Sequence, residues 1–138
     1  TNLSNVKIDS ATINDKIDVL NLNKYTDSDR HSGDYRYLFD EICIDVNEND
    51  CITSIYSRFD EGKTEITVND ISNITTIDQV EEILGDNYYD GIYDWEQLLN
   101  SYVYYDRENN IIAEFVYFNF DEESINNRVL TWIDIYRK

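Results

Sequence analysis

Residues that commonly carry catalysis or hold metal ions are scarce in this chain. His31 is the only histidine, so a nucleophile–histidine pair or a histidine-based zinc site would have to use it. His31 lies in a polar segment without a nucleophile motif nearby. The 29 Asp and Glu residues allow many glycosidase-like acid pairs, but no apolar pocket singles one out. The sequence therefore predicts no catalytic centre, no cofactor and no enzyme activity.

Two acidic runs resemble parts of a calcium-binding loop. Asp45–Asn49 and Asp27–Asp29 both place oxygen-bearing side chains at alternate positions. Neither run has the glycine expected at the sixth position, and Tyr56 and Leu38 stand at the twelfth, where a glutamate is needed. Turn formation explains both runs, so we predict no metal site.

The two cysteines, Cys43 and Cys51, fall on the two arms of one predicted hairpin. If Asn47 is the centre of the turn, the cysteines lie opposite each other and can form a disulfide. If the turn is centred one residue later, Cys43 faces Thr53 and a bridge would be strained. We predict a bond under oxidising conditions, with two buried thiols as the alternative.

The most informative surface candidate is the aromatic part of the segment Asp86–Gln97, which is predicted to be a loop. Tyr and Trp are enriched in binding hot spots because they give a large contact area at low entropic cost. The predicted binding residues are Tyr88, Tyr89, Asp90, Tyr93, Asp94 and Trp95. The alternative is that some of these aromatic residues, Trp95 above all, fold back as a lid on the core.

Net charge restricts the choice of partner. With 11 basic and 29 acidic residues, the chain carries a formal charge of −18. This disfavours nucleic acids and anionic membrane surfaces, which carry the same sign. It favours attraction to a protein with a basic surface. No apolar run is long enough to span a membrane.

Two similar stretches organise the chain, because Thr12–Asn21 (TINDKIDVLN) aligns without a gap with Thr76–Gly85 (TIDQVEEILG). Each stretch predicts a short amphipathic helix, over 13–21 and 77–84, with a threonine cap at its start and Asn21 or Gly85 at its end. The predicted apolar stripes consist of Ile13, Ile17, Leu20, Ile77, Val80 and Leu84.

Strands are predicted around these helices by alternation of apolar and polar residues. Residues 1–11 are expected to form an arm or an edge segment. The predicted strands are Tyr35–Val46, Cys51–Phe59, Thr64–Asn69, Tyr102–Tyr105, Ile111–Phe120 and Arg128–Tyr136. In the last strand, Ile133 and Ile135 share one face, and Trp132 and Tyr136 share the other.

Further matches between the halves indicate a tandem duplication. Asn49–Ile52 corresponds to Asn109–Ile112, and Phe59–Glu61 corresponds to Phe120–Glu122. We therefore predict an α+β domain made of two helix-plus-meander repeats, 1–67 and 68–138, which share one antiparallel sheet. Both helices should lie on one face of this sheet, which leaves aromatic residues on the opposite face.

The second repeat resembles the unit of the BamE/SmpA outer-membrane lipoproteins, through Thr76–Gly85 and the later hairpin of Tyr102–Tyr105 and Ile111–Tyr117. Two such units in tandem resemble the β-lactamase inhibitor proteins. The resemblance implies a non-catalytic, protein-binding role that uses the concave sheet face and its loops. Proline usually follows the Leu-Gly pair in these units, and this chain has no proline, so β-lactamase inhibition is not carried over.

Two settings fit this prediction. The first is an exported or envelope-associated bacterial protein, secreted or lipid-anchored, whose signal or lipid-attachment segment preceded Thr1. The second is an acidic cytoplasmic immunity protein that neutralises a basic toxin such as a nuclease. The acidity fits both settings, and a Cys43–Cys51 bridge would argue mildly against the second.

Overall fold

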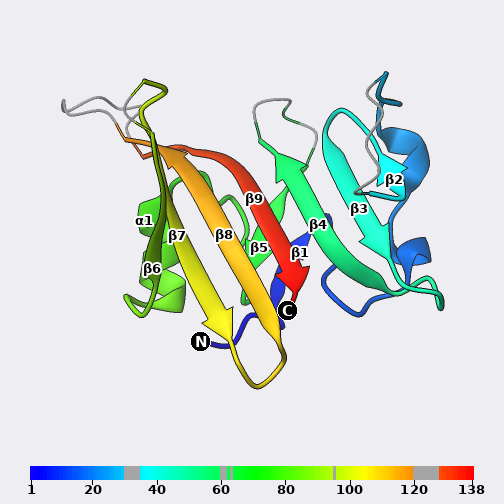
Figure 1. Ribbon diagram of the computed structural model, residues 1–138, viewed down its shortest axis with the longest axis horizontal. Coiled ribbons are helices and arrows are strands. Elements are labelled where there is room, and N and C mark those ends of the chain that lie inside the picture. The colour runs from blue at the N-terminus through cyan, green and yellow to red at the C-terminus, as the bar shows by residue number, and fades with distance from the viewer. Residues whose placement is uncertain (30–34, 60–61, 63, 95, 120–127) are drawn as a thin grey trace.

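A computed structural model describes residues 1–29, 35–59, 62, 64–94, 96–119 and 128–138 (Figure 1). Its larger sheet has seven strands, all antiparallel to their neighbours. They lie in the order β2 (Tyr37–Leu38), β3 (Ile42–Val46), β4 (Ile52–Arg58), β9 (Leu130–Arg137), β8 (Ile111–Phe118), β7 (Leu99–Asp106) and β6 (Tyr89–Asp94). A second, two-stranded sheet pairs β1 (Val6–Ile8) with β5 (Ile66–Val68). The predicted α+β class with antiparallel sheets is confirmed.

Helix α1 (Ile77–Leu84) has the predicted bounds. The Thr76 hydroxyl accepts a hydrogen bond from the Gln79 amide, and the Gln79 side chain accepts one from the Thr76 amide, which forms a capping box. Ile77 and Val80 are buried. Gly85 ends the helix at a φ of 92°, a conformation that side chains disfavour.

The helix predicted over 13–21 is wrong. Its place is taken by two short 3₁₀ turns, η1 (Ile17–Val19) and η2 (Leu22–Lys24). Asn14 has a φ of 77°, which an α-helix does not allow. Its amide donates to the Ile52 carbonyl (2.8 Å), and the Ile52 amide donates to the Asp15 carbonyl (2.8 Å). Pairing with the start of β4 therefore replaces the helical hydrogen bonds.

Two strand predictions need correction. Tyr35–Val46 is not one strand, because the chain reverses after β2, where the Phe39 amide donates to the Ile42 carbonyl (3.0 Å). Thr64–Asn69 contains β5, but this strand pairs with β1 outside the larger sheet. Strand β9 lies between β4 and β8 at the centre of the larger sheet.

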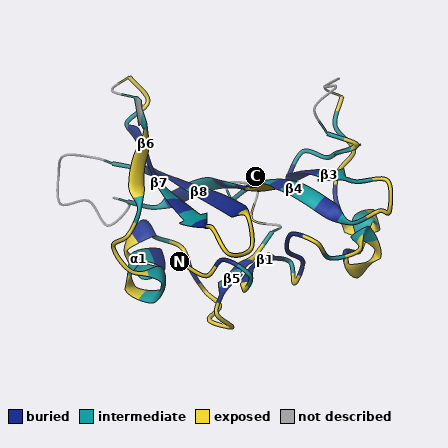
Figure 2. Ribbon diagram, turned by 60° about the horizontal axis from the view of Figure 1, so that its bottom comes forward, coloured by how far each residue is buried: buried dark blue, intermediate teal, exposed yellow. Residues whose placement is uncertain are grey.

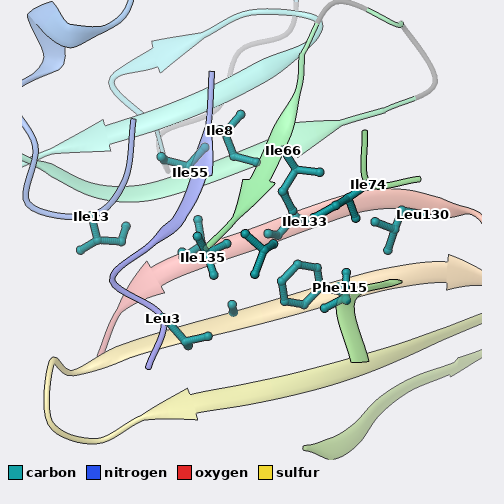
Figure 3. Packing of buried hydrophobic residues seen from close by; sticks show 14 of the residues in the cluster. Leu3, Ile8, Ile13, Ile55, Ile66, Ile74, Phe115, Leu130, Ile133 and Ile135 are labelled. Atoms are coloured by element: carbon teal, nitrogen blue, oxygen red, sulfur yellow. The ribbon is translucent and has the colours of Figure 1, made fainter. Parts of the chain in front are cut away.

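The helix and the smaller sheet cover one face of the larger sheet, as Figure 2 shows for α1, β1 and β5. The core lies between these layers (Figure 3). From the larger sheet it receives the buried side chains of Ile55, Phe115, Ile133 and Ile135, and from the covering segments those of Leu3, Ile8, Ile66 and Ile74. We call the opposite face of the larger sheet the open face.

The predicted disulfide is wrong, because Cys43 and Cys51 are not bonded to each other. Cys43 pairs across the sheet with Tyr56, five positions further along the chain than Cys51. A bulge at Asp45 and Val46 and the turn Asn47–Asp50 set this register. At ~3.3 Å per residue along a strand, the two cysteines are too far apart for a bridge.

Candidate functional site

The open face carries a line of large and charged side chains on its central strand. Side chains alternate along β9, so Trp132, Asp134 and Tyr136 point away from the core that receives Ile133 and Ile135. Tyr136 is 36% exposed. The face therefore combines aromatic surface with a carboxylate at its centre.

Asp134 lies between an acid and a phenol. In the strand register it is opposite Glu114 of β8 on one side and opposite Tyr56 of β4 on the other. Directly opposed like charges destabilise a sheet. Burial of the carboxyl group and, second, the charge of Glu114 raise the pKa of Asp134 to about 6.

The two acids differ in their hydrogen bonds. The Ser101 hydroxyl donates to Glu114 Oε2 (2.6 Å) and accepts from the Ile92 amide (2.7 Å). Within the described part of the chain, no group forms a hydrogen bond or an ion pair with Asp134. A partly buried carboxylate without a compensating donor is unfavourable and is typical of functional sites.

Aromatic groups surround this carboxylate. The rings of Tyr56 and Trp132 lie 6.2 Å apart between centroids and are tilted against each other. Tyr35, just before β2, lies close enough to interact with its charge. Burial and, second, the charge of Asp134 raise the pKa of the Tyr35 phenol to about 12. The arrangement is that of a charged centre with an aromatic rim.

The segment Asp86–Gln97 was predicted to be a loop, and this is wrong for its central part. It contains β6, which pairs with β7 and forms the edge of the larger sheet. Gly91 lets β6 approach the open face closely, because a Cβ atom there would collide with Ser101 Oγ and Glu114 Oε2. Strand β6 thus covers the Ser101–Glu114 hydrogen bond.

The predicted binding residues divide between surface and support. Tyr88 stacks on Tyr102 at 3.6 Å, its hydroxyl donates to Glu81 (2.9 Å), and it packs against the core, as in the lid interpretation. Tyr89 is 58% exposed and lies edge-on to Tyr105, with ring centroids 5.3 Å apart. Tyr89 therefore provides surface next to the open face, whereas Tyr88 is mainly structural.

The other predicted residues are placed as follows. Asp90 is exposed, and the Asp94 carboxylate accepts hydrogen bonds from the Glu96 and Gln97 amides, so it organises its own turn. Tyr93 pairs with Asn100 through the backbone of β6. The side chain of Tyr93, all of Trp95 and all of His31 lie outside the described residues.

A hollow adjoins the open face where β6 begins. It has a volume of about 470 Å³ and is lined by Tyr89, Tyr105, Asp106, Arg107, Asn110, Ile111, Ile112 and Lys138. The Asp106 carboxylate is engaged by the Leu3 amide (2.8 Å) and by the Asn109 side-chain amide (2.8 Å), so it anchors the N-terminal arm. The hollow extends the aromatic surface that Tyr89 begins.

An arginine on the covered side serves a structural purpose. Arg128 Nη2 donates to the Tyr102 hydroxyl (2.7 Å), and Arg128 Nε forms an ion pair with Asp78 of α1 (3.0 Å). Its guanidinium lies 5.1 Å from the ring centroid of Tyr117. These contacts join the first turn of α1 to the sheet.

Turn chemistry accounts for one of the calcium-like runs. The Asn47 side chain accepts hydrogen bonds from the Asn49 amide (2.9 Å) and the Cys51 amide (3.1 Å), so it closes its own turn. Among the described residues, no group of three or more His, Cys, Asp or Glu could hold a metal ion. The described helix is too short and too polar to cross a membrane.

Sequence reasoning missed the centre of this site. Trp132 and Tyr136 were placed on the face opposite Ile133 and Ile135, and Asp134 shares their parity, so the alternation WIDIY was an available signal. The opposition of Asp134 to Glu114 depends on strand order, which the local pattern does not contain. Comparison with known proteins adds no assignment, because no family model, curated protein or solved structure matches the chain.

Proposed function

We propose that the chain is a non-catalytic protein-binding module whose open face docks on a partner with a basic surface. The observation that carries this proposal is Asp134, an acid without a hydrogen-bond donor among the described residues, facing Glu114 on the central strands. An arginine or lysine from a partner would supply the missing positive charge and hydrogen-bond donors. Charge-assisted hydrogen bonds of this kind are strong when shielded from water.

The aromatic residues supply the rest of the interface. Tyr56, Trp132 and Tyr136 lie beside the acid, and Tyr89 is the most exposed large apolar residue of the described chain. Tyr and Trp around a central charge are the usual composition of a hot spot. The net charge of −18 would speed the encounter with a basic partner, whereas the aromatic contacts would slow dissociation.

A tandem duplication, related in plan to the β-lactamase inhibitor and BamE/SmpA proteins, remains our proposal for the origin of the fold. Strands β1 and β5 support it, because each is followed by two residues of positive φ. These are Asp9 (49°) and Ser10 (73°), and Asn69 (51°) and Asp70 (67°). Bridges Ile8–Ala11 and Val68–Ile71 then close both turns alike. Because β5 begins at Ile66, a second unit that starts with this strand begins slightly before the boundary expected between 1–67 and 68–138.

Location separates two versions of this function. The first is an exported or envelope-associated module, secreted or lipid-anchored. The second is a cytoplasmic immunity protein that neutralises a basic toxin such as a nuclease. Because Cys43 and Cys51 do not form a disulfide with each other, the argument that a bridge would make against the second version does not apply.

The test is a capture experiment followed by kinetics. The whole chain is immobilised, a partner is isolated from the source cells, and its binding is compared for wild type, Tyr89→Ala and Tyr136→Ala. Each substitution removes a ring that is at least 36% exposed, so the fold should persist. Loss of a hot-spot ring should weaken binding roughly 30-fold, mainly by faster dissociation.

The matched control is Val19→Ala, which removes an exposed apolar side chain (49%) from η1, away from the open face. It should bind like wild type. Raising the salt concentration should slow association of every variant, because exposed charges are screened. If both tyrosine variants fold and bind the captured partner like wild type, the open face is not its docking surface.

A further inference from the structure

The pair formed by Glu114 and Asp134 stands among groups that keep their charge state in mildly acidic solution. The titratable or charged groups nearest Asp134 are Glu114 from β8, Tyr105 from β7, Tyr56 and Arg58 from β4, Cys43 from β3, Tyr136 from β9 itself, and Tyr35 from the segment before β2. Asp45 of β3 lies further from the centre, across Ser54 from Tyr136. Phenols, thiols and guanidinium groups titrate above neutral pH. A change of charge at the centre of the open face therefore comes from the two carboxyl groups.

We propose that this pair makes the open face a pH-dependent docking surface, which holds a basic partner at neutral pH and releases it in mildly acidic solution. The inference rests on the proposed function, because it assumes that a cationic side chain meets Asp134. It goes beyond that function by naming protonation of Asp134 as the event that controls binding of the partner.

The mechanism is competition between a proton and a cation for one carboxylate. At neutral pH both acids are charged and repel each other, and a cationic side chain relieves this repulsion. When Asp134 takes up a proton, the repulsion disappears and the neutral acid offers no charge to the partner. Glu114 keeps the hydrogen bond from Ser101 (2.6 Å) in both states, so Asp134 is the group that switches.

The size of the effect follows from the fraction of Asp134 that is ionised. Burial and the charge of Glu114 raise its pKa to about 6. At pH 5 roughly one molecule in ten then has the charged, binding-competent form, so the apparent affinity should fall about tenfold between pH 8 and pH 5. Ordinary carboxylates stay ionised over this range.

The experiment uses the whole chain and a tetra-arginine amide peptide as the cationic probe. Binding is followed by amide chemical shifts from pH 8 to pH 5, in a His31→Asn background because histidine titrates in the same range. Shifts at Tyr56, Trp132 and Asp134 report binding to the open face. The expected result is an affinity there that falls about tenfold with a midpoint near pH 6.

Two variants isolate the switch. Asp134→Asn is uncharged at every pH, so its affinity at the open face should be low and flat. Glu114→Gln removes the opposing charge but keeps an oxygen that can accept from Ser101, so the midpoint should move to lower pH. Unchanged circular dichroism shows that both variants fold.

The outcomes separate this inference from the function on which it rests. Binding at the open face that is equally strong at pH 8 and pH 5 would overturn the switch and leave the docking surface intact. A wild-type pH dependence that persists in Asp134→Asn would also overturn it, since another group would then be responsible. Peptide shifts confined to other surfaces at every pH would count against the docking surface itself.

Discussion

Replacing Asp134 by asparagine is expected to stabilise the free protein at neutral pH. The folded state raises the pKa of Asp134 from the ordinary value of 3.8 to about 6, through burial and the charge of Glu114. The folded protein therefore resists ionisation that the unfolded chain accepts. As pH rises from 4 through 6, the wild type loses stability from this residue, whereas an asparagine is neutral throughout.

The magnitude follows from this shift of about two pKa units. At 1.36 kcal/mol per unit the ceiling is about 3 kcal/mol, and solvent screening of a partly exposed group reduces the expected gain to about 1–2 kcal/mol. Urea unfolding should then show a midpoint higher by roughly 0.5–1 M at pH 7 to 8. The gain should disappear near pH 4, where both forms are neutral.

The control is Asp18→Asn, which neutralises an exposed acid of η1 and changes the net charge by the same amount. It reports how much stability is gained by lowering general repulsion alone. If Asp134→Asn gains no more than this control at pH 8, or if its gain is the same at pH 4, then Asp134 is not a strained acid and the reasoning fails.

Three further substitutions test the supports of the site. Gly91→Ala should displace β6, since the new methyl group meets Glu114 Oε2, and hydrogen exchange of the β6 amides should accelerate at a cost of about 1–3 kcal/mol. Asp106→Ala should destabilise by about 1–3 kcal/mol in urea unfolding because the buried Leu3 amide loses its acceptor. Thr76→Ala should lower the unfolding free energy by about 1 kcal/mol through loss of the helix cap.

Local signals were sufficient where the chain satisfies its own hydrogen bonds. Thr76, Gln79 and Gly85 lie within α1 or next to it, and they define both ends of the helix without help from distant residues. The hairpin of β7 and β8 is similar, because a short turn fixes its register. The bounds of α1 were predicted correctly and the start of β8 was too, whereas β7 begins three residues before its predicted start at Tyr102.

Secondary structure was predicted wrongly where backbone groups distant in the sequence take the hydrogen bonds that a local element would use. Ile13, Ile17 and Leu20 have helical spacing, but the backbone of Asn14 and Asp15 bonds to Ile52, which no local pattern reveals. Strand β6 was predicted to be a loop, although its tyrosines and Ile92 favour a strand. Gly91 permits close packing of β6 beside Ser101 and Glu114, a contact that no local pattern reveals.

The candidate site depends on register, which sequence alone defined poorly. The turn after β3 is centred two residues later than Asn47, and together with a bulge at Asp45 and Val46 this sets Cys43 opposite Tyr56 and away from Cys51. Placement of β9 between β4 and β8 then set Asp134 opposite Glu114. Strands β4, β8 and β9 were predicted, but their order in space was not, so the local pattern did not show which residues of the open face meet.

Substitution of a structural residue and substitution of a binding residue change the stability of the free protein in opposite directions. Asp134 allows the two roles to be compared directly. If its role were structural, removal of its charge would lower stability and would lower affinity only through misfolding. If its role is to receive a cation, the same substitution should raise the stability of the free protein and lower its affinity for a basic partner. If Asp134→Asn is more stable than the wild type and also binds the partner more weakly, the free protein keeps a strained acid whose charge is compensated by a cation of the partner.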